Sequence, residues 1–302
     1  FSVGVICAGV AHALLQEQLT RSMRAKTPML LTTFEFGVCS LLSAVWIFLF
    51  GTNGARPPLA PLLRISVLVF ASLVSGNFAL RYVSFPVKVL IKSCKLLPTM
   101  GLGTFLFHKR YSAMDHLAAT LLCAGLVGFT LAERTPSAST EKQSSPMGVA
   151  LLLFAVSCDA VQVLISERVM RSQMQLTPMH VMMHTNGFAF VPVLCGIFMT
   201  GEVGHMPEEM PWAALVLYGA SSWVGVCCFI ALCRTWGGTG AVLTTNTRKL
   251  LSIVVSFVVF PKPWNAGLLL SAGTVLSGVS VHAVSRTRRL HAADPNTGVK
   301  SS

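Results

Sequence analysis

The sequence predicts an all-helical membrane protein with ten transmembrane helices in two inverted five-helix repeats. Its composition excludes an ordinary soluble domain. Of the 302 residues, 53% are hydrophobic and 11% are charged, whereas soluble domains carry about 25% charged residues. Apolar runs of about 20 residues, the length that crosses a bilayer as a helix, follow one another along the chain. Short sequence elements also recur in its two halves.

Turn signals such as Asn53-Gly54, Gly237-Gly238 and Pro261-Lys262-Pro263 separate the apolar runs. The chain starts at Phe1 inside an apolar stretch, so we expect a truncated first helix rather than a signal peptide. The predicted spans are 1–16, 29–50, 61–80, 85–107, 112–131, 147–165, 178–199, 211–233, 240–260 and 265–284. They divide the chain into a first repeat (1–132), a polar linker (133–146), a second repeat (147–285) and a cytosolic tail (286–302).

The repeat rests on two matches between the halves. Lys95-Leu96-Leu97 in the fourth span corresponds to Lys249-Leu250-Leu251 in the ninth, 154 residues later, and Gly125 corresponds to Gly278 at an offset of 153. Because five spans is an odd number, the second copy must lie upside down in the membrane. Inverted repeats of this kind place a substrate site near the midplane, between the two halves.

The charge of the connecting loops predicts the orientation. The loops on the side of the two termini carry eleven Lys and Arg residues, and the opposite loops carry seven. Because basic loops stay on the cytosolic side, we expect both termini in the cytosol.

Five cations lie inside predicted spans. Lys88, Lys92 and Lys95 fall on one face of a helix that turns about 100° per residue, and Arg248 and Lys249 lie within the ninth span. A charge at the bilayer centre costs about 2.5–3.5 kcal/mol on insertion scales, so such groups usually line a polar pathway. The cluster predicts a cargo with several negative charges, most simply phosphate.

A buried ion-pair network is the alternative explanation, with Glu17, Glu35 and Asp159 as counter-charges. Three carboxylates do not neutralise five cations, so about two positive charges remain for a ligand. Lys88 lies just after Pro86, near the start of the span, so its long side chain can extend to the membrane interface instead of lining the interior. Pro98 leaves the carbonyl of Cys94 without its helical partner and predicts a bend there.

Other function classes find less support in the sequence. The net charge of +12 is not concentrated on a water-soluble segment, which argues against nucleic acid as a partner. The nine cysteines lie in or beside apolar runs without zinc-site spacing, and we expect them to pack as small hydrophobic residues. His180 and His184 lack a third metal ligand. We expect no metal, no cofactor and no enzymatic activity.

Several motifs resemble the nucleotide-sugar transporter family of the drug/metabolite transporter superfamily. The resemblance lies in the group that contains UDP-galactose, ER ATP/ADP and 3′-phosphoadenosine 5′-phosphosulfate (PAPS) transporters, and it covers nearly the whole chain. The segments that carry it are Leu15-Gln16-Glu17, Phe85 to Met100, Lys109-Arg110-Tyr111, Asp159, Glu167, Asn186 and Thr245 to Lys249. Two positions depart from the family pattern: Ser166 replaces a glutamine, and Asn246 interrupts the threonine run before Arg248.

The resemblance implies a bilayer-embedded antiporter that exchanges a nucleotide conjugate for a nucleoside monophosphate across a Golgi or ER membrane. The fourth span and the end of the fifth are most similar to the second PAPS transporter type, with a UDP-sugar (UDP-galactose or UDP-glucose) as the alternative cargo. A small-metabolite exporter of the same fold is a third hypothesis. The expected substrate-binding residues are Lys92, Lys95, Arg248, Lys249, Thr245 and Asn186. The residues Val299-Lys300-Ser301-Ser302 lack a dilysine ER-retrieval signal, which favours the Golgi over the ER. The sequence leaves undecided whether the chain forms a homodimer.

Overall fold

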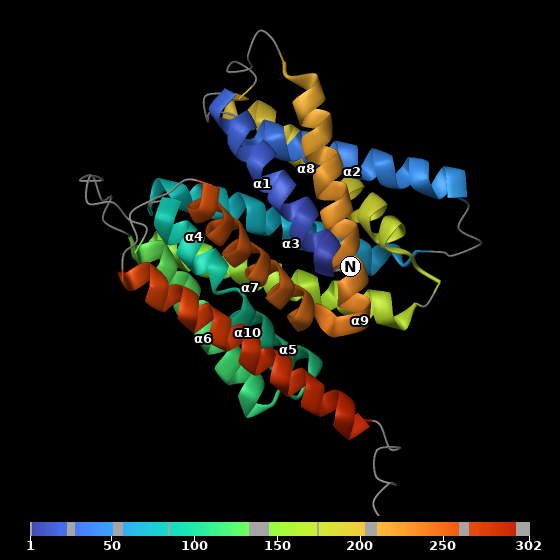
Figure 1. The fold of residues 1–302 in the computed structure, drawn as a ribbon. Coiled ribbons are helices and arrows are strands. Elements are labelled where there is room, and N and C mark those ends of the chain that lie inside the picture. The colour runs from blue at the N-terminus through green and yellow to red at the C-terminus, as the bar shows by residue number, and fades with distance from the viewer. Residues whose placement is uncertain are drawn as a thin grey trace, which may run out of the picture.

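The computed structural model describes residues 2–22, 28–50, 57–83, 85–132, 145–173, 175–202, 210–259 and 266–293. Within these ranges the regular structure is entirely helical and contains no strand (Figure 1). The elements are α1 (Ser2–Ser22), α2 (Pro28–Phe50), α3 (Leu59–Phe78), the 3₁₀ turn η1 (Ala79–Arg81), α4 (Phe85–Ser93), α5 (Leu96–Phe107), α6 (Ala113–Ala132), α7 (Pro146–Ser172), α8 (Pro178–Thr200), α9 (Trp212–Val259) and α10 (Ala266–Ala293).

Five of the described helices are long and apolar enough to cross a membrane, namely Met29–Phe50, Leu59–Phe78, Pro146–Ser172, Pro178–Phe198 and Trp212–Asn246. Large apolar side chains point outward from several helices: Phe48 is 87% exposed, and Phe105, Phe198 and Leu270 are also exposed. A water-facing surface rarely carries so many large apolar groups close together. These helices therefore fit an environment of lipid.

The predicted fourth span, 85–107, is not one continuous helix. The helix α4 ends at Ser93 and α5 begins at Leu96, with Cys94 and Lys95 in a turn between them. The cause is Pro98, which has no N–H to give to the Cys94 carbonyl. That carbonyl accepts the N–H of Leu97 instead, at 3.2 Å. The bend expected from Pro98 is present, and it separates two helices rather than curving one.

The predicted eighth and ninth spans are two helical segments that meet directly at Gly237, without a loop, and share the label α9 (Figure 1). Gly237 interrupts the helical conformation with φ 79° and ψ 165°. Glycine adopts positive φ readily, whereas residues with a Cβ do so at a cost. The Gly237-Gly238 pair therefore marks the interruption at the right place, but no separate loop connects the two segments. Three other helices extend beyond their predicted ends at residues 16, 165 and 284: α1 ends at Ser22, α7 at Ser172 and α10 at Ala293. Polar residues beyond the apolar run continue a helix when nothing breaks it.

The helices pack in pairs that join the two halves of the chain. The main pairs are α1 with α9, α2 with α8, α3 with α7, and α6 with α10, which lies along α6 in Figure 1. Gly125 of α6 lies against Ser271 and Val275 of α10, and Gly278 of α10 lies against Ala118 and Leu122 of α6. These are the two glycines that mark the repeat, and they bring the pair into close contact.

A large buried cluster lies where α5, α6, α7, α9 and α10 meet. It includes Leu96, Met100, Leu122, Val242 and Val275, each with 4% or less of its surface exposed. Cysteines contribute to this and a neighbouring cluster, and all nine are free thiols. Several of them therefore pack as small apolar side chains, while Cys7 and Cys195 are exposed. The first cluster forms the wall behind the polar cavity described below.

Candidate functional site

The α4 lysines face the protein interior. Lys88 Nζ donates a hydrogen bond to Asn77 Oδ1 at 2.9 Å, and Lys92 Nζ lies 3.6 Å from Asp159 Oδ2. Both side chains run past Gly76 of α3, where an added Cβ would lie 3.3 Å from Lys92 Cε. Lys88 therefore bonds to the end of α3. Asp159, one of the expected counter-charges, lies within ion-pair distance of Lys92.

Lys95 occupies the break between α4 and α5. Its carbonyl accepts both the N–H and the Oγ1–H of Thr99, at 3.1 and 2.7 Å, so the backbone at the break is tied to the next turn. The side chain of Lys95 is half-buried, and the next residue, Leu96, belongs to the same buried cluster as Cys233 of α9.

The second arm of the predicted site lies on α9. Thr245 is half-buried, and its hydroxyl donates to the carbonyl of Val242 at 2.7 Å. Asn246 is completely buried, and neither polar atom of its side chain has a hydrogen-bond partner in the described structure. Burying an amide without hydrogen bonds costs free energy, which makes Asn246 a candidate substrate-binding residue. The side chains of Arg248 and Lys249, and that of Glu17 on α1, lie outside the described residues.

Two predicted residues lie apart from the lysines. Asn186 is half-buried on α8, which packs against α2, α3 and α9, and no described contact joins its side chain to α4. Glu35 does not pair with a lysine as expected among the described contacts. It accepts hydrogen bonds from Tyr218 at 3.0 Å and Ser222 at 2.5 Å, and His12 Nε2 lies 3.8 Å away. Hydroxyl groups on α9 thus satisfy this carboxylate and fasten α2 to α9.

The two candidate metal-binding histidines bond to their own helix. His180 Nδ1 lies 2.8 Å from Thr177 Oγ1, and His184 Nδ1 lies 2.8 Å from the carbonyl oxygen of His180. No group of three or more His, Cys, Asp or Glu side chains in the described residues forms a metal site. The contacts agree with a structural role for this pair.

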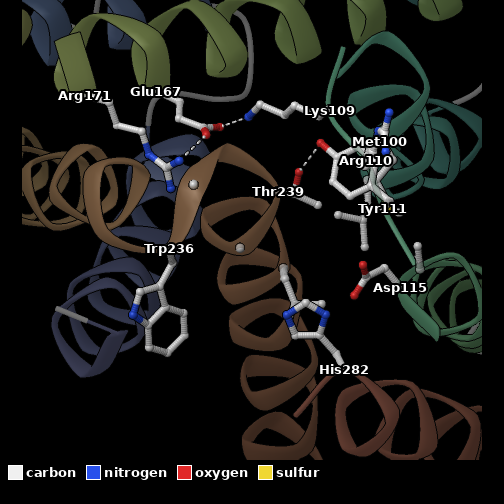
Figure 2. Close-up of a pocket in the computed structure, with 15 residues that line it drawn as sticks. Met100, Lys109, Arg110, Tyr111, Asp115, Glu167, Arg171, Trp236, Thr239 and His282 are labelled. Atoms are coloured by element: carbon white, nitrogen blue, oxygen red, sulfur yellow. Dashed lines mark hydrogen bonds and ion pairs between the residues drawn. The ribbon is translucent and has the colours of Figure 1, made fainter. Parts of the chain in front are cut away.

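A polar cavity of about 330 Å³ opens where the α5–α6 turn, the end of α7 and the kink of α9 meet. Its charged lining residues are Lys109, Arg110, Asp115, Glu167 and Arg171, and His282 joins them from α10. Figure 2 shows Lys109 and Arg171 approaching Glu167 from opposite sides, with Trp236, His282 and Asp115 around the rest of the cavity. Tyr111 and Thr239 share a hydrogen bond of 2.9 Å across its wall.

Glu167 organises one side of this cavity. Its carboxylate is 5% exposed and accepts a short hydrogen bond from Lys109 Nζ. It also accepts the N–H of Gly238 at 2.5 Å, and Arg171 Nη1 lies 3.4 Å away. One buried carboxylate therefore ties the α5–α6 turn and the α9 kink to α7. The sequence marked Glu167 and Lys109 only as family motifs, because no spacing rule connects residues 58 positions apart.

Helices of membrane length around an interior that holds several cations define a multi-pass membrane transporter. The sequence model of the UAA transporter family matches residues 1–286, and the chain belongs to this family. The family and the relatives below are transporters, so the expectation of a transporter rather than an enzyme is confirmed at the level of the family.

The relatives carry names of a narrower kind. "Adenosine 3'-phospho 5'-phosphosulfate transporter 2" of Drosophila melanogaster is 29% identical over 80% of this chain and 62% of its own length. The Homo sapiens protein of that name is 28% identical over 85% of this chain and 64% of its own. The chain thus spans less than two thirds of these relatives. "Solute carrier family 35 member B1" of Rattus norvegicus is 28% identical over 91% of this chain and 88% of its own length.

A solved crystal structure has the same fold as this chain. The two share a TM-score of 0.61 at 18% identity, with 92% of this chain and 97% of the other covered. The likeness concerns the fold alone.

Proposed function

We propose that the chain is a nucleotide-conjugate antiporter that carries PAPS from the cytosol into the lumen of the Golgi, or of the ER, in exchange for a nucleoside monophosphate. The observation that carries the proposal is the broken helix α4–α5, which holds Lys88, Lys92 and Lys95 inside a family-typical transporter fold. The names of two curated relatives, both PAPS transporters, support PAPS as the cargo.

The architecture that we propose is ten spans in two inverted repeats, 1–132 and 147–285, joined by the linker 133–146. The packing supports it by its reciprocity. If the second repeat is related to the first by a two-fold rotation, α6 corresponds to α10 and α2 corresponds to α8, and each of these helices packs against its own counterpart. The same rotation converts the α1–α9 contact into the α3–α7 contact. Gly125 and Gly278 both lie at the α6–α10 contact. A pseudo-two-fold axis in the membrane plane has this consequence.

In the proposed site, Lys95, Arg248 and Lys249 hold the phosphates, and Lys92 assists from the same face as Lys95. Arginine binds phosphate with two parallel hydrogen bonds, whereas lysine acts as a point charge. Thr245, Asn186 and the unsatisfied amide of Asn246 would contact ribose or base. Breaks in transmembrane helices commonly lie at substrate sites, because unwound backbone is tolerated where it lines a cavity.

The charge of this site favours exchange over uniport. The cations of an empty site repel one another, so reorienting the transporter around that site without a bound anion is unfavourable. A bound anion on each trip lowers that cost, so inward and outward transport become coupled. We propose that both termini face the cytosol. The cavity end of the bundle, which carries Lys109, Arg110 and Arg171, would then lie on the cytosolic side.

Uptake into reconstituted vesicles tests this function. The panel is PAPS, UDP-galactose, UDP-glucose, UDP-N-acetylglucosamine, ATP and a non-nucleotide anion, each with and without nucleotide on the far side. We expect PAPS uptake that depends on the internal nucleotide, and its loss in Lys95→Ala and Arg248→Ala. Arg168→Ala, which removes an exposed arginine beside Phe107, is the matched control.

Each contrary result has a separate meaning. Preference for a UDP-sugar would change the cargo but not the site. Uptake of the non-nucleotide anion alone would favour a small-metabolite exporter. Strong uptake without internal nucleotide would contradict exchange, and normal transport by both variants would refute the site.

A further inference from the structure

We propose that the cavity between the α5–α6 turn, α7 and the α9 kink is a second nucleotide-binding site, a vestibule that receives the base and phosphates before they reach the interior lysines. This inference rests on the proposed function and adds to it a position that the interior residues do not include. The ligand class is a phosphorylated nucleoside. The vestibule is defined by Lys109, Arg110, Glu167, Arg171, Trp236 and His282.

The size and the chemistry of the vestibule match such a ligand. Pockets for small organic molecules enclose about 300–1,000 Å³, and this one encloses about 330 Å³. Trp236 lines the cavity and is 42% exposed, so its indole offers a flat surface to a base. Arg110 is exposed on the same cavity, and guanidinium groups bind phosphate with paired hydrogen bonds. Aromatic stacking beside a cationic patch is the usual arrangement for nucleotides held without base-specific contacts.

The charges of the vestibule favour weak, transient binding. Lys109, Arg110 and Arg171 contribute three positive charges, and Asp115 and Glu167 contribute two negative ones, which leaves one positive charge with neutral His282. Glu167 already holds Lys109 and Arg171. Asp115 accepts hydrogen bonds from Ser112 N and Ser285 Oγ, both at 2.9 Å. The vestibule is therefore expected to bind a phosphate with low affinity and to release it readily.

The inner end of the vestibule leads toward the proposed substrate site. Leu96 and Leu243 line it. Leu96 directly follows Lys95 at the helix break, and Leu243 lies two residues before Thr245 on α9. The vestibule therefore borders the helix break and the α9 segment that carry the two arms of the proposed interior site.

A phosphate in this position could belong to a free nucleotide, to an inorganic anion or to a lipid headgroup. The base-sized surface of Trp236 favours the nucleotide, because the other two have no aromatic group to stack. The experiment therefore separates these three sources.

Equilibrium binding to the purified full chain in detergent tests the proposal. Radiolabelled PAPS, ATP and UDP-galactose are the probes, and pyrophosphate and mixed micelles that contain phosphatidylglycerol are the competitors. In the Lys95→Ala Arg248→Ala background we expect residual, weaker nucleotide binding. Trp236→Leu should weaken this residual binding about tenfold, in line with the contribution of one base stacked on an aromatic ring. Arg110→Gln should weaken it about tenfold or more, as expected for one charge-assisted contact.

Matched controls test whether these losses are specific. Trp212→Leu removes an exposed tryptophan that packs on Phe34 at the other end of the first segment of α9, and Arg168→Gln removes an exposed arginine outside the cavity. Both should leave residual binding unchanged. Thermal unfolding of every variant checks that the chain still folds.

The outcomes distinguish this inference from the proposed function. Loss of all binding in Lys95→Ala Arg248→Ala, or residual binding that ignores Trp236→Leu and Arg110→Gln, overturns the vestibule and leaves the interior site standing. Competition by pyrophosphate as strong as by nucleotide refutes the role of Trp236, and competition by phosphatidylglycerol alone identifies a lipid site instead. Full affinity in the Lys95→Ala Arg248→Ala background would support the vestibule but overturn the interior site. No nucleotide binding by the unaltered chain would overturn both.

Discussion

Two carboxylates on α7, eight positions apart, meet lysines in different ways. Asp159 is 24% exposed and lies 3.6 Å from Lys92, which is itself 30% exposed. Glu167 is 5% exposed and accepts hydrogen bonds from Lys109 and Gly238, with Arg171 also within ion-pair distance. The first pair is open and loosely held, whereas the second is closed and has three partners.

This difference separates a charge that a ligand can use from a charge that holds the fold together. A partly exposed pair at 3.6 Å contributes less to stability than a closed, buried one, so a phosphate can replace the carboxylate as the partner of Lys92 at a smaller cost. A buried carboxylate with three donors leaves those donors unsatisfied when it is removed. We therefore expect substitutions at Glu167 to affect folding first, and substitutions at Lys92 to affect transport first.

Glu167→Ala should have the largest effect. It leaves Lys109, Arg171 and the N–H of Gly238 without their shared acceptor, and breaking a buried pair in this way costs about 3–5 kcal/mol. The measurement is the thermal unfolding temperature in detergent, with transport lost in parallel. Glu167→Gln retains an acceptor for Gly238 and should lose less. Equal stability of Glu167→Ala and the unaltered chain would remove the distinction between the two pairs.

Gly237→Ala should have the next largest effect. The residue has φ 79°, and an added Cβ would lie 3.1 Å from Glu167 Oε1. Backbone strain at such a position costs about 1–3 kcal/mol, and the kink would shift away from Glu167. Gly101→Ala is the matched control, because a Cβ there meets nothing within 4 Å. Equal unfolding temperatures for Gly237→Ala and Gly101→Ala would show that the kink does not depend on glycine.

Lys92→Met should reveal the opposite behaviour from Glu167→Ala. We expect it to destabilise the chain less than Glu167→Ala does, because the ion pair of Lys92 is partly exposed and involves a single described carboxylate. Its nucleotide uptake should fall about tenfold, since one charge-assisted contact contributes about 1.5 kcal/mol or more. Vesicle uptake and unfolding are measured on the same preparation. A variant that unfolds early but transports normally would reverse the assignment of the two regions.

Asp159→Asn should have the smallest effect. It removes the negative charge but keeps a side chain of the same shape beside Lys92. Nucleotide affinity should rise or stay within about threefold, because Lys92 no longer has to leave a carboxylate. Asp115→Asn is a useful comparison, since Asp115 accepts a hydrogen bond from Ser285 that joins α6 to α10 and a local one from Ser112 N. A complete loss of binding in Asp159→Asn would indicate that this carboxylate contacts the substrate itself.

Much of the fold could be predicted because it depends on local properties of the chain. Apolar runs of membrane length predicted where the helices lie, and Pro98 and Gly237 predicted the two interruptions, since both act through their own backbone. The form of each interruption was not predictable. Whether a glycine pair ends a helix or kinks it depends on what packs against it, here Glu167 and Val163.

The sequence by itself determined that this is a multi-pass helical protein with cations at membrane depth and a family resemblance in its motifs. Hydropathy and charge act residue by residue, so they can be read along the chain. Only the tertiary structure decided which carboxylate meets which cation. Glu35 bonds to Tyr218 and Ser222, Asp159 lies beside Lys92, and Glu167 joins Lys109 to Gly238. These partners lie 58 to 187 residues apart, and only the packing of helices can bring them together.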